Sequence, residues 1–269
     1  MKTIDRYITE KLKLSKNSVK KKNPNCKYFP ETTEELLRII KDHVGIDNYD
    51  LNDIDVSSIT NMEFLFNKVA TYDNELDKID VSKWDTSHVT SMKEMFSNCK
   101  YFEGGGIENW DVSNVTNMQG MFSQCENMNV NFSNWNTSKV KSMESMFWGC
   151  KMFKGRGLKE WNVSNVENMD YMFYSSHNVD EDISDWNTSN VKSAQSEFKY
   201  CVSMVCDFSK WDYSKIENAV DMFSNCHGMK WNAKEINFKP IVNNLGEANY
   251  DGMFDSTKII VPSWYKDGD

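Results

Sequence analysis

Proline and glycine are scarce in this sequence, at 4 and 12 of 269 residues. This scarcity excludes a collagen-like chain, which needs glycine at every third position, and a disordered chain rich in Pro and Gly. Aromatic residues make up 13% of the sequence and charged residues 26%, a balance typical of a chain that folds around a buried core. Methionine and tryptophan are abundant instead, with 16 and 9 residues, and this excess needs a structural explanation.

Long apolar runs are also missing. No stretch approaches the roughly 20 consecutive apolar residues of a membrane-spanning helix. The opening segment, MKTIDRYITEKLKL, is charged where a signal peptide would be apolar. We therefore expect no membrane contact and a cytoplasmic protein whose 7 cysteines are free thiols. If the gene belongs to a phage, we expect a virion-associated protein instead.

Positive charge is in deficit, because the chain carries a net charge of -9. A protein that binds the nucleic-acid backbone needs a positive field, so this balance argues against general nucleic-acid affinity. The charge is uneven, however: residues 1–22 carry a net charge of +6 and the remaining residues one of -15. Nucleic-acid contact is therefore considered only for this basic N-terminal arm.

Motifs of catalysis and metal binding are absent as well. HExxH, GxSxG, Walker and GxGxxG patterns do not occur, and the 4 histidines are scattered. Five of the cysteines recur once per repeat copy, not at the close spacing of metal ligands, which predicts a buried ladder of small residues. The sequence predicts no enzyme, no catalytic residues, no metal and no cofactor.

Six copies of one phrase fill the middle of the chain. Each copy opens with Trp and carries Ser three, Phe twelve, and Cys or Ser fifteen residues later. A unit this short cannot bury its own apolar face, so the copies must stack and share one core. The opening residues, 25 or 26 positions apart, are Trp84, Trp110, Trp135, Trp161, Trp186 and Trp211.

The copies predict a repeat solenoid. Phrases that favour β structure precede the Trp residues, as at 107–110 and 183–186, and suggest one short parallel strand per coil. A helical turn is predicted by the i, i+3, i+4, i+7 spacing of Met92, Met95, Phe96 and Cys99. We therefore predict an α/β repeat solenoid, leucine-rich-repeat-like, with about 25 residues per coil.

Four regions are predicted along the chain: the basic arm at 1–22, an N-terminal helical cap at 23–53, the solenoid at 54–230 and a C-terminal cap at 231–269. A capping box at 32–35 predicts a helix within residues 31–45. Caps are expected because the ends of a stack of copies would otherwise expose the core.

The repeated phrase W-[DN]-[TV]-S-x-V-x-[NS]-M-x-x-M-F-x-x-C resembles the BspA-type leucine-rich repeat in its Met-Phe variant, seen in surface proteins of mycoplasmas and other bacteria. This resemblance implies an adhesion or interaction protein without enzymatic activity. The lead segment MKTIDRYITEKLKLSKNS resembles short lead segments on uncharacterised proteins of gut bacteria and their phages. That second resemblance implies a docking or packaging tag on a phage virion-associated structural or cargo protein.

Aromatic residues interrupt the repeat in its third to fifth copies. Thirteen residues after the Trp, a position beside the buried Phe that should face outward, the column is otherwise polar. Trp148 and Tyr174 occupy this column, and Tyr171 and Tyr200 lie in neighbouring columns. We predict that these four residues form an exposed partner-binding patch. The alternative is that these rings pack flat on neighbouring coils.

The basic arm has apolar residues at helical spacing, which favours docking into a groove of a protein partner. A solvated tail and a nucleic-acid contact are the alternatives. The predicted docking residues are Ile4, Tyr7, Ile8, Lys11, Leu12 and Lys13.

From these features we predict a non-enzymatic protein–protein interaction or structural repeat protein, acting alone or within a larger assembly. It would bind a protein partner through the solenoid surface. The alternatives are a phage virion-associated structural or cargo protein and a glycan- or host-binding adhesin.

Overall fold

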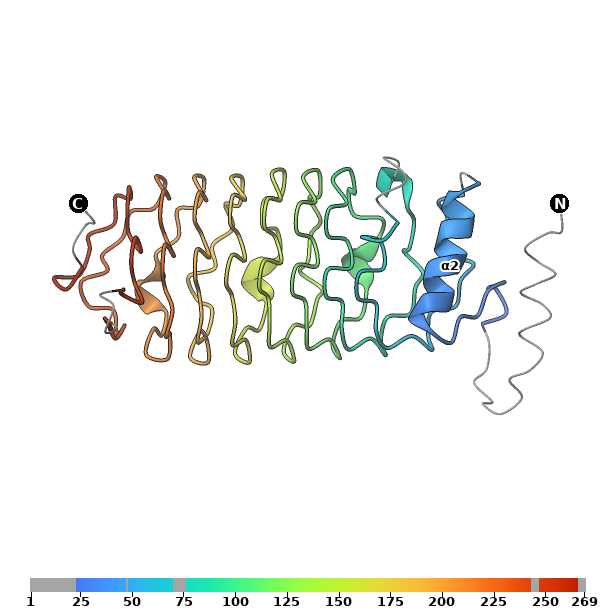
Figure 1. Ribbon diagram of the computed structural model, residues 1–269, viewed down its shortest axis with the longest axis horizontal. Helices are drawn as coiled ribbons and strands as arrows, with labels where there is room; N and C mark the ends of the chain where they lie inside the picture. The colour runs from blue at the N-terminus through green and yellow to red at the C-terminus, as the bar shows by residue number, and fades with distance from the viewer. Residues whose placement is uncertain (1–22, 47, 70–75, 243–246, 266–269) are drawn as a thin grey trace.

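The computed structural model describes residues 23–46, 48–69, 76–242 and 247–265. The chain winds into coils that lie side by side along the long axis, with helix α2 (Thr33–Val44) at one end and residues 231–265 at the other (Figure 1). Parallel one-residue bridges connect the coils from one copy to the next, at Asn61–Ser91, Ser91–Asn117, Asn117–Ser142, Ser142–Asn168, Asn168–Ser193 and Ser193–Asn218.

The predicted strand and helical turn in each coil are both wrong. Within the described ranges, α2 is the sole α-helix and β structure is limited to isolated bridges. Short 3-10 helices directly precede three of the Trp residues, and a fourth, η2 (Leu76–Lys78), lies further upstream of Trp84. These three are η3 (Ile107–Asn109), η4 (Leu158–Glu160) and η5 (Phe208–Lys210). The described chain is therefore not an α/β repeat solenoid with a strand per coil, and it lacks the strand-and-helix plan of a leucine-rich repeat.

Alternating hydrogen bonds explain why no strand forms. In the copy that begins at Trp84, every second residue donates its N–H to the next coil over 2.7–3.0 Å, namely Met92, Glu94, Phe96 and Asn98. Three residues that alternate with or follow them donate instead to carbonyls three positions back, namely Met95, Ser97 and Cys99. Glu94 and Asn98 adopt the left-handed region, with φ of 50° and 64°. The backbone thus turns repeatedly where an extended strand would run straight.

Helix α2 forms within the residues for which the capping box predicted a helix. The side chain of its N-cap residue, Thr32, accepts a hydrogen bond from the Glu35 N–H over 3.2 Å. Its buried residues belong to the same hydrophobic cluster as the coils and include Leu36, Ile39 and Ile40. No helix in the described ranges has both the length and the apolar composition needed to cross a bilayer.

Aromatic side chains stack along the core that the coils share. The Phe twelve positions after each Trp contacts its counterpart in the next coil, from Phe96 to Phe223, with ring centroids 5.6–5.8 Å apart. Phe223, in the last copy, contacts Phe254 at 5.8 Å. Each repeat Trp donates its indole N–H to a carbonyl of the preceding coil over 2.9–3.3 Å. The polar edge of every one of these rings is therefore satisfied inside the core.

The cysteine column forms the predicted buried ladder. Four thiols each donate to the Phe carbonyl of the preceding coil over 2.7–3.0 Å, namely Cys125, Cys150, Cys201 and Cys226. Ser176 makes the same hydrogen bond in the copy that lacks Cys, to the carbonyl of Phe147. Burial raises the pKa of each of these thiols, that of Cys226 to about 12. All seven cysteines are free, which fits a packing role.

Candidate interaction surface

The four aromatic residues predicted as a patch lie together, and we call this cluster the aromatic patch (Trp148, Tyr171, Tyr174 and Tyr200). The Trp148 ring lies 6.0 Å from that of Tyr171 and 5.6 Å from that of Tyr174, between ring centroids. Tyr174 contacts Tyr171 at 6.0 Å and Tyr200 at 5.7 Å. Three consecutive coils therefore build one continuous aromatic surface, although the residues span more than fifty positions of sequence.

The rings of the aromatic patch remain partly open to solvent. Trp148 is 39% exposed and Tyr200 is 37% exposed, while Tyr171 and Tyr174 are half-buried. The contacts of Tyr174 with Trp148 and Tyr200 are edge-to-face, with interplanar angles of 70° and 85°. Trp148 also stacks on Tyr171 of the next coil, with an interplanar angle of 27°, so this ring lies partly flat on its neighbour while keeping accessible surface.

Backbone hydrogen bonds between coils hold the aromatic patch in place. The Trp148 carbonyl accepts from the Gln124 N–H at 2.6 Å, and the Tyr174 carbonyl accepts from the Gly149 N–H at 2.8 Å. Tyr171 and Tyr200 occupy left-handed turn positions, with φ of 58° and 68°. Because adjacent coils are hydrogen-bonded in register, side chains at equivalent turn positions lie about 5 Å apart along the stack.

Charged groups border the aromatic patch. Lys199 Nζ lies 2.7 Å from Asp221 Oδ2 and 5.7 Å from the ring centroid of Tyr200. Burial lowers the pKa of Lys199, but its hydrogen bond and Coulomb attraction to Asp221 outweigh burial, so the pKa is raised overall. Burial raises the pKa of Tyr171, and the carboxylates of Asp170 and Asp221 raise it further. Two carboxylates and one ammonium group thus border the rings.

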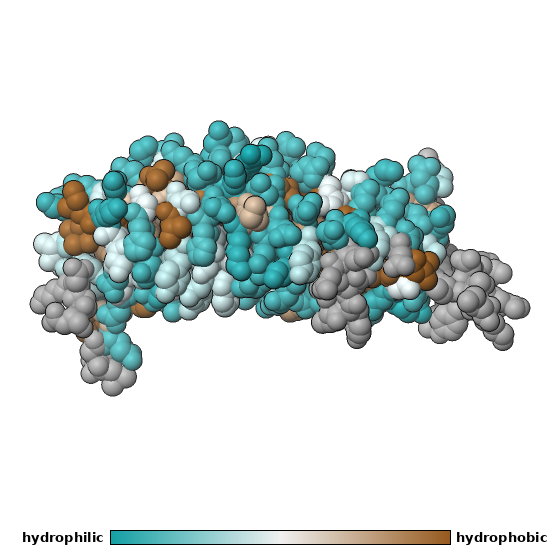
Figure 2. Space-filling model, turned by 90° about the horizontal axis from the view of Figure 1, so that it is seen from above, coloured by the Kyte–Doolittle hydropathy of each residue, from teal (hydrophilic) through white to brown (hydrophobic). Residues whose placement is uncertain are grey.

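Sequence reasoning missed other exposed apolar residues on the same coils. Val202 is 41% exposed and Val205 is 68% exposed, both in the coil of Tyr200, and Met152 is exposed in the coil of Trp148. A signal was present, because the column of Val202 otherwise contains only charged residues and histidine: Lys100, Glu126, Lys151, His177 and His227. Figure 2 shows such hydrophobic spots on an otherwise largely hydrophilic face.

The predicted docking residues of the arm lie outside the described residues: Ile4, Tyr7, Ile8, Lys11, Leu12 and Lys13. The structure therefore brings together every predicted residue of the aromatic patch and does not place those of the arm. Nowhere in the described part of the chain do three or more His, Cys, Asp or Glu side chains gather in a way that could hold a metal ion.

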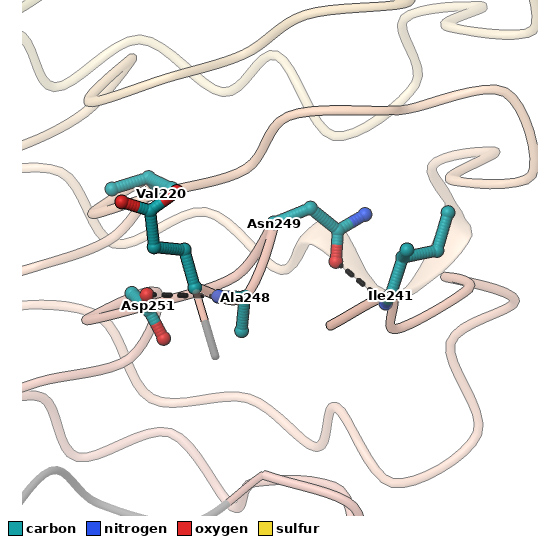
Figure 3. Close-up of a pocket in the computed structure, with 6 residues that line it drawn as sticks. Val220, Ile241, Ala248, Asn249 and Asp251 are labelled. Carbon is teal, nitrogen blue, oxygen red and sulfur yellow. Dashed lines mark hydrogen bonds between the residues drawn. The ribbon is translucent and has the colours of Figure 1, made fainter. Parts of the chain in front are cut away.

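A cavity of about 440 Å³ lies near the C-terminal end (Figure 3). Its polar side chains already serve the local loop: Asn249 Oδ1 accepts from the Ile241 N–H at 2.8 Å, and Asp251 Oδ2 accepts from the Ala248 N–H at 3.0 Å (Figure 3). These two side chains hold the backbone that borders the cavity. The aromatic patch is therefore the stronger candidate for a binding site, because its rings do not serve to hold a local loop.

Coils stacked in register, with equivalent residues forming one core and one aromatic surface, define a repeat protein. Residues 76–157 and 152–259 match the family described as "Mycoplasma protein of unknown function, DUF285", and the chain belongs to this family. This mycoplasma family agrees with the resemblance of the repeated phrase to a repeat found in mycoplasma proteins. Comparison with curated proteins found no match to this chain.

Proposed function

We propose that this protein is a non-enzymatic binding protein that holds another protein through the aromatic patch, with the coils as its scaffold. One observation carries the proposal: four aromatic side chains from three consecutive coils touch in a single cluster that stays partly exposed. Exposed aromatic clusters of this kind are typical anchors of protein interfaces. Trp148 and Tyr174 occupy one column, in which the other copies carry Ser97, Ser123, Lys199 and Ser224.

Two further observations support the proposal. The repeated phrase favours kinship with the BspA-type surface proteins in their Met-Phe variant, a resemblance that implies binding without catalysis. Membership of a mycoplasma repeat family is compatible with the same role.

The test is a quantitative pull-down from extracts of the cells that make the protein, with the intact chain and the double variant Trp148→Ala/Tyr174→Ala. We expect the double variant to retain less than about one tenth of the captured partner, since interface aromatics commonly contribute 2 kcal/mol or more each. Tyr101→Ala is the matched control, because Tyr101 is equally exposed, at 40%, but is not one of the four clustered rings.

Melting temperatures decide how this result is interpreted. If Trp148→Ala/Tyr174→Ala binds less but melts like the intact chain, the rings serve recognition. A lower melting temperature with unchanged capture would make them structural and contradict the proposal. Binding of the intact chain to a glycan array would favour the adhesin alternative, and co-purification with phage particles would favour the virion alternative.

A further inference from the structure

The aromatic patch has the chemistry of a receptor for a basic, amphipathic segment. Its rings present faces with negative electrostatic potential, which attract Lys and Arg side chains. Asp170 and Asp221 lie close enough to Tyr171 to influence its ionisation. Lys199 makes both kinds of contact within the structure, because its ammonium group lies against the Tyr200 ring and the Asp221 carboxylate.

One segment of the chain has the complementary chemistry. Residues 1–22 carry a net charge of +6, against -15 for the rest of the chain. Ile4, Tyr7, Ile8 and Leu12 follow a spacing that places apolar side chains on one face of a helix. Lys11 and Lys13 adjoin that apolar set. Charge would draw this arm to the acidic body in general, whereas its apolar residues need an apolar surface such as the aromatic patch.

The arm joins the described chain on the N-terminal side of the aromatic patch. The described chain begins at Asn23, whose N–H donates to Asp55 Oδ2 over 3.2 Å, in the degenerate copy that precedes Trp84. Along the stack the patch lies three to five coils further on, an axial offset of roughly 15–25 Å at about 4.8 Å per coil. It also lies about half a coil further around, because its residues stand 10–14 positions after the Trp and Asp55 stands one position after the equivalent Ile54. The residues between Lys13 and Asn23 can span about 30 Å when extended. Attachment to the same chain raises the local concentration of the arm at the surface of the body.

We propose that the aromatic patch is occupied by the arm of the same chain, with Ile4, Tyr7, Ile8 and Leu12 on the rings and with Lys11 and Lys13 beside Asp170 and Asp221. The inference uses the surface assigned under the proposed function. It adds that an outside partner carries a basic, amphipathic segment and displaces the arm when it binds.

Zero-length carbodiimide crosslinking of the full chain tests this contact, since it joins a lysine amine only to a carboxylate in direct contact. We expect crosslinks from Lys11 or Lys13 to Asp170 and Asp221, with a yield that falls about tenfold in Trp148→Ala/Tyr174→Ala. The Lys192–Glu167 pair, at 2.6 Å and outside the patch, is an internal control that both chains should crosslink equally. Tyr101→Ala is again the matched control.

Three outcomes would overturn the inference. Crosslinks from Lys11 and Lys13 could spread over the acidic surface, or their yield could persist in the double variant. In a mixture of isotopically light and heavy chains, crosslinks formed only between chains would also contradict it.

The variant Lys11→Glu/Lys13→Glu separates this inference from the proposed function. If the arm covers the patch, weakening the arm should increase partner capture in the pull-down. Unchanged capture by this variant, with capture still lost in Trp148→Ala/Tyr174→Ala, would overturn the inference and leave the proposed function standing. If neither variant alters capture, both fail.

Discussion

Glu197 is the residue that departs most from its surroundings. It is fully buried, and neither carboxylate oxygen has a hydrogen-bond partner in the structure. Burial raises its pKa well above the ordinary range, and the nearby charge of Asp170 raises it further. The same column holds methionine in the other copies: Met95, Met121, Met146, Met172 and Met222. A single polar residue thus interrupts an otherwise apolar column inside the coil that carries Tyr200.

Glu197→Met should stabilise the protein, and increasingly so as the pH rises. The folded state keeps Glu197 protonated above pH 4.3 or so, the ordinary pKa of Glu, whereas the unfolded chain releases the proton. The free energy of unfolding of the intact chain therefore falls as the pH rises from the ordinary pKa of Glu towards the raised pKa of Glu197 in the folded state. The slope is at most about 1.4 kcal/mol per pH unit. Urea unfolding at pH 5 and pH 8 measures the difference between the two chains.

Glu197→Gln is the matched control for this prediction. It removes the titrating group but keeps a buried polar one, so it should abolish the extra pH dependence without the full gain in stability. An identical pH dependence in all three chains would show that Glu197 does not titrate differently in the folded state.

At the scale of elements, each coil contains a series of turns whose N–H groups donate to the next coil. These turns take the place of the strand and the helix that local sequence patterns predict. Equivalent positions of successive copies adopt positive φ whatever residue occupies them: 60° at Gly120, 54° at Ser145 and 58° at Tyr171. Left-handed backbone costs a non-glycine residue roughly 1–2 kcal/mol. The inter-coil hydrogen bond at each position, such as Ser145 N–H to the Asp170 carbonyl at 2.8 Å, offsets that cost.

Ser145→Gly should therefore raise the free energy of unfolding by about 0.5–1 kcal/mol, because glycine adopts this φ without a steric penalty. Gly120→Ala should lower it by about 1 kcal/mol, since its new Cβ would also meet Glu94 Cγ at 2.8 Å. Chemical denaturation measures both changes. Ser145→Ala, which keeps a Cβ at the same φ, is the control and should change little; a gain equal to that of glycine would contradict the backbone explanation.

At the scale of the whole molecule, each coil is stabilised chiefly by its two neighbours. The Phe rings contact their counterparts in adjacent coils, the thiols donate to the preceding coil, and α2 covers the first coils as part of the same core. Stability is then a sum of terms for each copy and for each interface between neighbours. The aromatic patch depends on this order, because three coils must keep their register for four rings to touch.

A pair of double-mutant cycles tests this nearest-neighbour coupling. Phe122→Leu with Phe147→Leu changes two rings 5.8 Å apart, whereas Phe96→Leu with Phe223→Leu changes rings separated by five coils. We expect an interaction energy of about 0.5–3 kcal/mol for the adjacent pair and less than about 0.5 kcal/mol for the distant pair. Equal coupling in both cycles, measured by urea unfolding, would contradict a stack held together by local interfaces.

The aromatic patch shows how far sequence reasoning extends. Trp148 and Tyr174 could be identified because they interrupt a polar column, and their placement beside a buried Phe predicted exposure. Val202 and Val205 carried the same signal in neighbouring columns but were missed. The contacts among the rings depend on the spacing and register of the coils, which no single copy encodes.

The sequence by itself determined the number and register of the copies and the identity of the buried columns, because apolar residues recur at constant offsets from each Trp. Only the tertiary structure decided the backbone path between those columns. The spacing of Met92, Met95 and Phe96 fits a helix as well as it fits the observed turns. The choice between them is made by hydrogen bonds to neighbouring coils, which stabilise left-handed residues such as Glu94 that local propensity disfavours.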